Sequence, residues 1–530
     1  MKPIYLQALL ALIFISMSGC ARKNFYAKTP VVDPAVYKQL QQDPAAFDSV
    51  TVQAGKHYKS GFLHRLFWGT HYRPVWSAPV TLPVLRLDTI KGGLKFEKLG
   101  GGFQTTSMTL SDSTGFTYAL RSLDKDPVSV VPEVWQKTFV ANILRDQTSA
   151  INPYGALVIP PLAEAAGVPH SSPKLYYIAP NDTAFGEHTE RFSDNVFMLE
   201  EKYNGKEAIT PALGDAEDIV SSKKMLNKRF EKDNHFIDQQ AFVKARLLDI
   251  LINDWDRHEG QWEWATYKKD KNTIYRPIPK DRDNAFFRFQ DGIIPWLFSR
   301  NWAIRKFESF DEDINDVYAL AMNSEFLDQR ALAQVTRQQF DSVAVLLQQA
   351  ITDDVIAKAV KQLPPSVYKL EGEGMAKKLR SRRDELRKAA AEFYEILAKE
   401  PLVVGTDEED RFKVKRLNDE ETEVTITRKS DDAVIYRRTF YTSETKVLKL
   451  YGLAEDDKFE VSGEVNKGIK VVIVGGRGED EIKDTSKVKR GGKKTWVYDT
   501  KRGTEIEAGP ETKDKTTKDI RVNTFDREGF

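Results

Sequence analysis

Apolar and polar residues alternate with a period of two between residues 82 and 126, and glycine-rich turns interrupt this alternation. Three segments carry the pattern clearly: 94–99, 103–110 and 116–123. A period of two is typical of strands that bury one face, and turns rich in Gly, Asp and Ser join such strands into hairpins. The pattern therefore predicts a three-stranded antiparallel meander.

Beyond residue 130 the chain mixes helical spacing with short strand-like runs. The predicted elements are, in chain order, helices over 131–144 and 154–166, strands over 174–178 and 195–202, and a helix over 238–251. Gly167 is expected to end the second helix. In the last helix Ala241, Ala245 and Leu248 share one apolar face. The loop over residues 254–258 follows directly from the end of this helix.

Two acidic segments follow that helix. Residues 254–261 read Asp-Trp-Asp-Arg-His-Glu-Gly-Gln, and residues 279–284 read Pro-Lys-Asp-Arg-Asp-Asn. A hairpin of strands 262–267 and 273–278 is predicted between them. Carboxylates in such loops can hold a divalent metal over phosphates and accept the proton of an attacking hydroxyl, as phosphoryl transfer requires. The alternative is a charged loop held by local salt bridges.

The remainder of the chain divides at Pro401. Residues 311–400 are predicted to be mostly helical, whereas short β-rich segments and glycine turns follow and predict a separate β domain. Within it, Gly475–Ile482 matches one calcium-binding nonapeptide of the β-roll type, and 452–459 is a degraded companion. Two imperfect copies favour a plain β-turn in a sandwich or short solenoid over a calcium-filled roll.

The N-terminus has the layout of a lipoprotein signal peptide. Lys2 precedes an apolar run over 6–15, and small residues stand before Cys20, the only cysteine of the sequence. That run is too short for a stable membrane span, so residues 1–19 are predicted to be removed and Cys20 to carry a lipid. The alternative is an ordinary signal peptide with an accidental cysteine. Residues 20–60, with prolines and scattered charge, are predicted to form a tether.

Charge and flanking residues restrict the partners. Basic residues rather than Asp follow Cys20, which favours an outer-membrane, periplasm-facing anchor. The sequence has 79 basic and 78 acidic residues and a formal net charge of +1, whereas nucleic-acid binders show a basic excess. We therefore expect a membrane partner through the lipidated Cys20 and no nucleic-acid partner.

The acidic segments carry a family resemblance. Asp256-Arg257-His258, with Gln261 after it, resembles the catalytic loop of phosphoinositide lipid kinases and secretory-pathway casein kinases. Asp283-Asn284-Ala285 resembles the metal-binding turn of the same kinases, and residues 279–283 are similar to a segment of spore-coat CotH kinases.

This resemblance covers roughly residues 82–310 and implies a fold class. The expected fold is α+β, with a two-lobed protein-kinase-like domain over 61–310. A helical extension over 311–400 and a small all-β domain over 401–530 follow it.

The resemblance also implies roles for the acidic segments. Asp256 corresponds to the catalytic base, and His258 braces the loop. Asp283 is the main expected metal ligand and Asp281 a second. Gln261 stands where the family has a metal-binding Asn, and its side chain is one methylene longer. Mg²⁺ or Mn²⁺ suits such oxygen ligands.

A site for ATP or another nucleotide is implied on the meander. Backbone N–H groups of Gly100, Gly101 and Gly102 would approach phosphates, or these glycines form a plain hairpin turn. Arg121 stands where kinases have a strand lysine, and a guanidinium also holds phosphate. Glu164, on the following helix, is its expected partner.

Phrases such as residues 100–105 and 450–453 also look like a region of large Bacteroidota outer-membrane proteins with metallophosphoesterase or BamA/TamA-like parts. This implies an outer-membrane barrel protein as a partner. The expected function is a lipid-anchored envelope protein with an atypical kinase-like site, a phosphotransferase. The alternative is a non-catalytic, pseudokinase-type binding or assembly module, which Arg121 and Gln261 favour.

Overall fold

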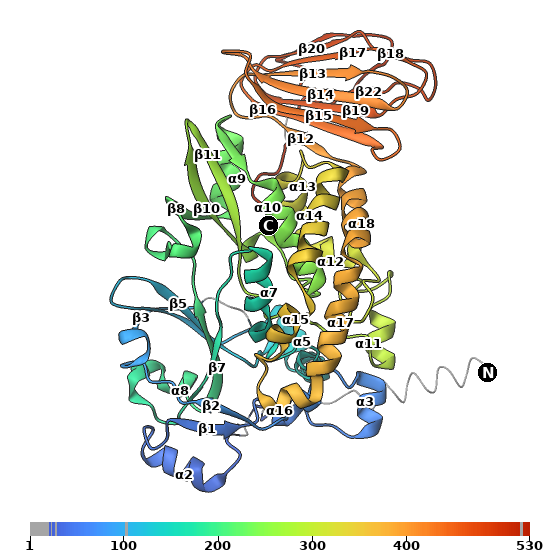
Figure 1. The fold of residues 1–530 in the computed structure, drawn as a ribbon. Coiled ribbons are helices and arrows are strands. Elements are labelled where there is room, and N and C mark those ends of the chain that lie inside the picture. The colour runs from blue at the N-terminus through green and yellow to red at the C-terminus, as the bar shows by residue number, and fades with distance from the viewer. Residues whose placement is uncertain (1–20, 23, 27–28, 101–103, 520–522, 530) are drawn as a thin grey trace, which may run out of the picture.

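The computed structural model describes residues 21–529 apart from residue 23 and segments 27–28, 101–103 and 520–522. The predicted signal peptide and Cys20 therefore lie outside the described residues. Three parts follow one another from bottom to top in Figure 1: a five-stranded sheet with its covering elements, a helical body and a stack of β-strands. This mixture agrees with the predicted α+β class.

The predicted meander forms the first strands of a five-stranded antiparallel sheet in the order β3-β4-β5-β7-β6. The strands are β3 (Lys95–Leu99), β4 (Ser107–Ser111), β5 (Thr117–Ser122), β6 (Lys174–Ile178) and β7 (Asn195–Glu201). Inward residues such as Leu110, Leu120 and Phe197 are fully buried between this sheet and its covering loops. The sheet holds one wall of the cleft described below.

Between β5 and β6 lie the helices α5 (Glu133–Gln136), α6 (Phe139–Gln147) and α7 (Ile159–Ala166). The helix predicted over 131–144 is thus divided. The Thr138 side chain accepts a hydrogen bond from the Val140 N–H and starts a new helix there. As predicted, α7 ends at Gly167, whose φ of 62° lies in the left-handed region.

The segment predicted to be a tether is folded from about residue 31 onward. It contains α2 (Pro34–Gln42) and β1 (Ser49–Val52), and β1 pairs with β2 (Val80–Pro83). Leu40 is fully buried. The prediction was wrong because the Asp33-Pro34 pair is a helix start: the Asp33 side chain caps α2, and proline fits the first helical position.

The helical body surrounds α10 and a four-stranded sheet in the order β8-β10-β11-β9. Its strands are β8 (Asp218–Ser221), β9 (His235–Ile237), β10 (Trp262–Lys269) and β11 (Asn272–Pro279). Its principal helices are α9 (Ser222–Glu231), α10 (Gln239–Leu251), α12 (Val317–Ala321), α13 (Glu325–Ala331), α14 (Arg337–Ala350), α15 (Asp353–Val360), α16 (Pro365–Val367), α17 (Glu373–Asp384) and α18 (Leu386–Ala398). The predicted helix, hairpin and helical segment 311–400 are confirmed. One hydrophobic core joins them.

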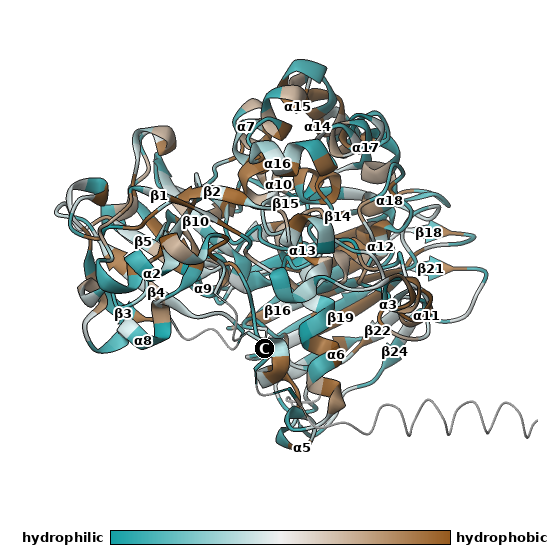
Figure 2. Cartoon of the chain, turned by 90° about the horizontal axis from the view of Figure 1, so that it is seen from below, coloured by the Kyte–Doolittle hydropathy of each residue, from teal (hydrophilic) through white to brown (hydrophobic). Residues whose placement is uncertain are grey.

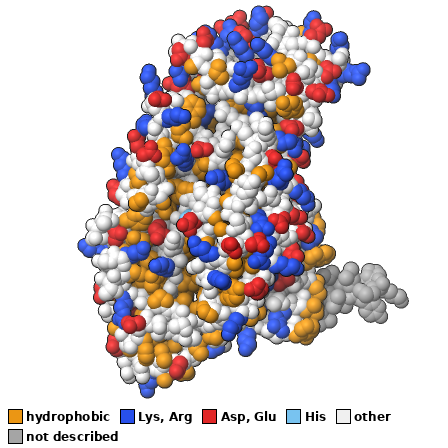
Figure 3. All heavy atoms as spheres, in the orientation of Figure 1, with side chains coloured by type: hydrophobic (Ala, Val, Ile, Leu, Met, Phe, Trp, Pro, Cys, Tyr) orange, Lys and Arg blue, Asp and Glu red, His pale blue; other side chains and the backbone are white. Residues whose placement is uncertain are grey.

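Four short helices lie at the edges of these two parts. They are α3 (Phe62–Trp68), α4 (Arg73–Trp76), α8 (Thr189–Phe192) and α11 (Ile293–Phe298). Figure 2 shows α3 and α11 as hydrophobic although they lie at the periphery. Basic and acidic side chains are interspersed over the face seen in Figure 3, in agreement with the balanced sequence charge. In the described part of the chain, no helix is long and apolar enough to cross a membrane.

After Pro401 the chain forms a short solenoid of two facing sheets. One sheet has the order β12-β16-β19-β22-β24 and the other β15-β14-β13-β17-β20-β23. The strands are β12 (Leu402–Val404), β13 (Asp410–Arg416), β14 (Glu421–Arg428), β15 (Val434–Tyr441), β16 (Val447–Ala454), β17 (Lys458–Ser462), β18 (Glu464–Val465), β19 (Lys470–Arg477), β20 (Asp480–Asp484), β21 (Lys487–Val488), β22 (Thr495–Val497), β23 (Thr504–Glu507) and β24 (Thr512–Asp514). Successive coils pair in parallel, as Leu448 with Val471.

The motif at Gly475–Ile482 lies where two coils of this solenoid stack. Asp457 N–H donates to Asp480 Oδ1 at 3.0 Å, and Asp410 N–H donates to Asp457 Oδ1 at 2.8 Å. We call the buried row of Asp410, Asp457, Asp480 and Asp499 the carboxyl stack. The structure corresponds to the solenoid alternative.

Candidate functional site

A cleft of about 670 Å³ opens between the five-stranded sheet and the loop that follows α10. Its lining includes Gly100, Thr105, Ser107, Arg121, Lys125, Lys202, Asp256, His258, Gln261, Asp281, Asp283 and Asn284. Most of the candidate site residues thus converge. Gly101 and Gly102 lie outside the described residues, and Glu164 does not line the cleft.

The cations of the cleft face its carboxylates. Arg121 Nη1, on β5, lies 3.0 Å from Glu200 Oε1 on β7 and also contacts the Asp281 carboxylate. Lys125, just beyond the end of β5, contacts the Asp283 carboxylate. The sheet therefore supplies two positive groups, and the turn after β11 supplies two negative ones.

Burial and the neighbouring charges shift the pKa values of these carboxyls. Burial, with the neighbouring charge of Asp281, raises the pKa of Asp283 to about 6. Burial also raises the pKa of Glu200 to about 7. Although burial opposes it, the cations Arg121 and Lys125 lower the pKa of Asp281. The turn therefore holds two carboxyls of different acidity.

Two amides hold the Asp256 carboxylate. Asn323 Nδ2 donates to Asp256 Oδ1 at 3.0 Å, and Asn284 Nδ2 donates to Asp256 Oδ2 at 3.3 Å. The Asn284 amide also donates to Asp283 Oδ1 at 3.1 Å, so it bridges the two carboxylates. The two amides only donate to Asp256, and a carboxylate has further lone pairs. Asp256 can therefore still accept a proton from a bound hydroxyl.

His258 and Gln261 make hydrogen bonds that hold the loop. The His258 ring Nδ1 accepts from the Gly260 N–H at 3.1 Å and so caps a short helical turn. The carbonyl oxygen of Gln261 accepts from Arg257 Nη2 and from the Lys280 N–H, each at 3.1 Å. The loop is thereby tied to the end of β11.

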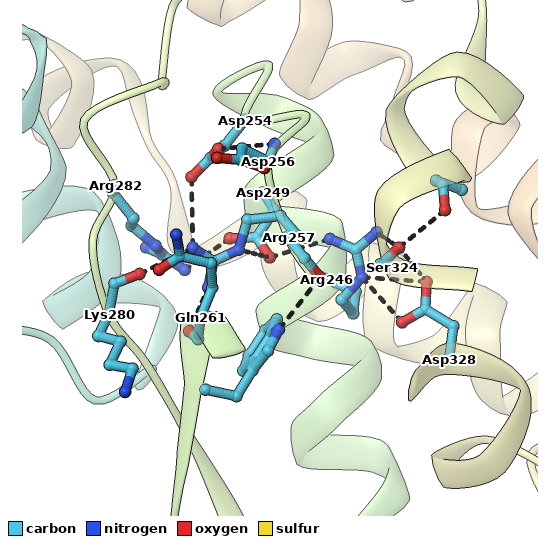
Figure 4. Close-up of polar contacts among 12 residues, drawn as sticks. Arg246, Asp249, Asp254, Asp256, Arg257, Gln261, Lys280, Arg282, Ser324 and Asp328 are labelled. Atoms are coloured by element: carbon cyan, nitrogen blue, oxygen red, sulfur yellow. Dashed lines mark hydrogen bonds and ion pairs between the residues drawn. The ribbon is translucent and has the colours of Figure 1, made fainter. Parts of the chain in front are cut away.

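A buried ionic network supports the cleft from below. Asp249, near the end of α10, accepts hydrogen bonds from Arg246 at 3.0 Å, Arg257 at 3.2 Å and Arg282 at 2.8 Å. Figure 4 shows these side chains converging beneath the loop that carries Asp256. Because Arg257 precedes His258 and Arg282 lies between Asp281 and Asp283, one carboxylate positions both acidic segments.

The network extends to the helices on either side. Arg246 forms two hydrogen bonds with Asp328, at 3.0 and 3.2 Å, on α13. The Arg257 guanidinium lies 4.6 Å from the ring centroid of Trp262. Burial raises the pKa of Asp254, which lies beside Arg257, to about 7. The network thus has six acidic and basic groups, and all of them except Arg282 are at most 1% exposed.

One predicted partnership was wrong. Glu164 lies on the exposed side of α7, 3.8 Å from Lys358 Nζ, and does not pair with Arg121. Glu200 takes that place because β5 and β7 are neighbours in the sheet, with Ala119 opposite Glu200. Glu200 is almost fully buried, as a carboxylate paired with a buried guanidinium is expected to be.

The sequence analysis gave no role to three other polar residues, Lys125, Asn284 and Asn323. Lys125 follows Arg121 in the phrase Arg-Ser-Leu-Asp-Lys, and Asn284 directly follows Asp283, so both were visible next to candidate residues. Asn323 gave no such signal because it reaches Asp256 from a turn after α12. Its role depends on how α12 packs.

The far end of the cleft is apolar. Trp255, Phe287, Phe289 and Phe307 line it, with ring centroids 5.0 Å apart for Trp255 and Phe307. Such a wall suits a planar ring or an acyl chain next to the charged end. The described residues contain no group of three or more His, Cys, Asp or Glu side chains placed to hold a metal ion.

The comparisons with known proteins give a distant structural similarity to kinases. No protein-family model and no curated sequence matches the chain. Similar solved structures include the proinflammatory kinase CtkA of Helicobacter pylori, with 13% identity and a TM-score of 0.29 over 54% of this chain and 94% of that one.

Two further kinases show the same loose similarity. The Rio2 kinase of Chaetomium thermophilum, in a complex with ADP, Mg²⁺ and phosphoaspartate, matches at 13% identity and a TM-score of 0.22 over 56% of this chain and 71% of its own. A Golgi casein kinase matches at 12% identity and a TM-score of 0.24 over 70% and 89%. Because these TM-scores are low, the matches assign no residue roles, and the roles considered below come from the chain's own geometry.

Proposed function

We propose that this protein is a lipid-anchored envelope protein whose cleft binds a nucleotide with Mg²⁺ or Mn²⁺ and acts as an atypical kinase-like phosphotransferase. The carrying observation is the convergence of Arg121, Lys125, Asp256, Asp281 and Asp283 on one cleft. In this proposal the five-stranded sheet and the helical body are the two lobes of a kinase-like domain.

The charge pairs of the cleft can exchange partners. Arg121 and Lys125 are placed to turn from Asp281 and Asp283 to phosphate oxygens, which frees both carboxylates for a cation. Mg²⁺ is usually held by one or two carboxylates together with substrate phosphates and water. A bound divalent ion would neutralise charge on the phosphates. The donor set therefore fits a metal that arrives with a nucleotide.

Asp256 is the proposed base. Its carboxylate lies beside Asp283 through the shared Asn284 amide, and it faces the cleft. It would accept the proton of the hydroxyl that receives the phosphoryl group. His258 and Gln261 keep the loop in place, and Gln261 is the proposed third oxygen ligand.

Thermal unfolding with metals and nucleotides tests the proposal. Mg²⁺ or Mn²⁺ alone should leave the Tm unchanged, whereas metal with ATP should raise it, because ligand binding stabilises the folded state. Asp283→Asn should abolish the shift. Asp341→Asn, which alters an exposed ion pair with Arg387, should retain it. No shift with any nucleotide and metal would refute the proposal.

Transfer is tested separately from binding. Asp256→Asn should keep the thermal shift but lose transfer of a labelled γ-phosphate from ATP, because the amide cannot accept the proton. Equal transfer by wild type and Asp256→Asn would remove Asp256 from the mechanism.

A second candidate is a non-catalytic binding or assembly module for an outer-membrane barrel or another envelope partner. It is favoured by the mutual neutralisation of Arg121, Lys125, Asp281 and Asp283, and by Gln261 in place of a shorter amide. Crosslinking in intact cells should then recover a barrel protein, and the thermal shift should be absent. Crosslinks to no envelope protein would count against this module.

The anchor belongs to the same proposal. Cys20 would carry the acyl chain and place the protein on the periplasmic side of the outer membrane. Labelling with a palmitate analogue should mark the wild-type protein and not Cys20→Ala. Equal labelling of both proteins would contradict the anchor.

A further inference from the structure

Two short peripheral helices expose an unusual set of large apolar side chains. We call this set the aromatic face: Phe62, Leu63, Leu66, Phe67, Ile293, Trp296, Leu297, Phe298, Trp302 and Ile304. Phe62 is 70% exposed, and Leu63 and Trp302 are each 68% exposed. In Figure 3 hydrophobic side chains gather at the lower right edge, where Figure 1 places α3 and α11. A contiguous patch of this kind marks an interaction site.

The aromatic face is held rigidly. The buried His71 donates its backbone N–H to Asp291 Oδ2 at 2.7 Å, and its ring Nδ1 lies 2.6 Å from Asp291 Oδ1. A Cβ on Gly292 would lie 2.2 Å from the Gly69 nitrogen, so the chain segments beside α3 and α11 approach as only glycine allows. The exposed side chains thus stand on a fixed support.

The start of the described chain lies close to this face. Ala21 N–H donates to the Lys137 carbonyl at 3.1 Å, and Arg22 N–H donates to Asn142 Oδ1 at 2.8 Å on α6. Nε2 of His64, on α3, lies 3.1 Å from Oδ2 of Asp146, which is also on α6. Residues 142 and 146 are one turn apart and share a helix face.

Consequently, the chain start and α3 are fastened to neighbouring positions of α6. The twenty residues that precede Ala21 include the apolar run 6–15 and Cys20. In the lipoprotein proposed above, the acylated Cys20 directly precedes Ala21 and brings a bilayer next to α6. The face of α3 and α11 is a large apolar surface close to it.

We propose that the aromatic face docks on a lipid bilayer, as a second membrane contact beside the N-terminal anchor. Trp and Phe rings are suited to the boundary between headgroups and acyl chains. Cations flank them: Arg65 lies on α3, and the Arg300 guanidinium is 4.5 Å from the Trp296 ring centroid. These cations fit lipid phosphates. A lipid at one point of the chain leaves the protein free to rotate on the membrane, so a second contact fixes its orientation.

The contact also orients the cleft. The His71 ring, which supports the face, is stacked on Phe289 at 6.0 Å between centroids, and Phe289 lines the apolar end of the cleft. The docked face therefore holds that end of the cleft near the bilayer. The inference does not depend on phosphotransferase activity.

Tryptophan quenching by brominated lipids tests the contact. The full-length protein is reconstituted in vesicles of phosphatidylethanolamine and phosphatidylglycerol with brominated acyl chains. Emission should be quenched, and the double variant Trp296→Phe/Trp302→Phe should lower the quenchable fraction about twofold because these rings lie at the bilayer boundary. Trp496→Phe, in the solenoid, should not lower that fraction.

A second variant keeps both reporter tryptophans. Phe62→Asp/Leu63→Asp, at two exposed positions, should reduce quenching while the circular dichroism spectrum stays unchanged. Quenching that persists in both double variants overturns the proposal. A second outcome also overturns the proposal: the protein shows no quenching in vesicles but self-associates in detergent, and Phe62→Asp/Leu63→Asp abolishes the association. The aromatic face would then bind a second copy of this chain.

Discussion

The cleft and the carboxyl stack both bury acidic side chains, and they satisfy them in opposite ways. In the cleft, Asp281 and Asp283 face Arg121 and Lys125. In the stack, the described residues place no Lys or Arg in an ion pair with Asp457, which accepts a backbone N–H instead. Asp457 is 1% exposed, whereas the Asp283 side chain is 18% exposed.

This difference separates a site that can exchange ligands from one that cannot. Burial raises the pKa of Asp457 to about 10, so this carboxyl is protonated at neutral pH and attracts no cation. Burial raises the pKa of Asp283 only to about 6, because Lys125 opposes the effect. The cleft therefore retains ionised carboxylates next to an opening, whereas the stack holds the neutral acid Asp457 within a wall.

The largest expected effect is at the support of the cleft. Asp249→Ala removes a carboxylate shared by three buried arginines and should lower the free energy of unfolding by about 3–5 kcal/mol, because it leaves buried charge uncompensated. Urea unfolding measures it. Asp341→Ala, at an exposed pair, should change the free energy by less than about 1 kcal/mol. Equal losses would show that the network does not support the cleft.

A smaller loss is expected within the cleft itself. Lys125→Met keeps the length of the side chain but leaves the Asp283 carboxylate without its counter-charge, so stability should fall by about 1.5–3 kcal/mol. Urea unfolding at pH 7 checks this value. If stability is unchanged, the Lys125–Asp283 pair is not holding the two walls together.

The stack should be sensitive to volume rather than charge. Gly452→Ala would place a Cβ 2.0 Å from Asp457 Oδ2 and 2.4 Å from the Gly475 carbonyl oxygen, and should cost about 1–3 kcal/mol. Gly374→Ala, on α17 with nothing within 4 Å, should instead stabilise by about 0.5–1 kcal/mol. Urea unfolding of both variants decides this, and a neutral Gly452→Ala would mean that the coils can shift apart.

Local patterns predicted the elements that carry the cleft. The periodicity of 238–251 and the alternation on either side of residue 270 placed Asp256 and Asp283 at element ends, and both now line the cleft. Partners that depend on strand order were not predictable. Glu200 meets Arg121 only because β7 pairs with β5, although β6 precedes β7 in the chain.

The same limit explains the tether and the solenoid. Proline is common both in linkers and at helix starts, so Asp33-Pro34 was interpreted as part of a linker. Only the packing of Leu40 distinguishes the two. Gly452 and Gly475 were recognised as related, but their parallel stacking depends on pairing between residues 23 positions apart, as in Tyr451 with Val474. Non-local pairing of this kind leaves only a faint periodic trace in the sequence.

The smallest expected effect is that of Asp457→Asn in acid. The change replaces a neutral acid with a neutral amide of similar shape, so below the ordinary pKa of a carboxyl, 3.8, stability should change by less than about 1 kcal/mol. At pH 7 the variant should be the more stable protein, because only the wild-type carboxyl must take up a proton on folding. The pH profile should change more. In the unfolded chain this carboxyl loses its proton near its ordinary pKa, whereas the folded state keeps it up to a pKa of about 10. The unfolded state then binds fewer protons, so stability falls as pH rises through that window, by at most about 1.4 kcal/mol per pH unit.

Urea unfolding between about pH 6 and pH 9 should show a flatter profile for Asp457→Asn than for wild type. Parallel profiles would mean that Asp457 is ionised in the folded state, and the contrast with the cleft would be lost.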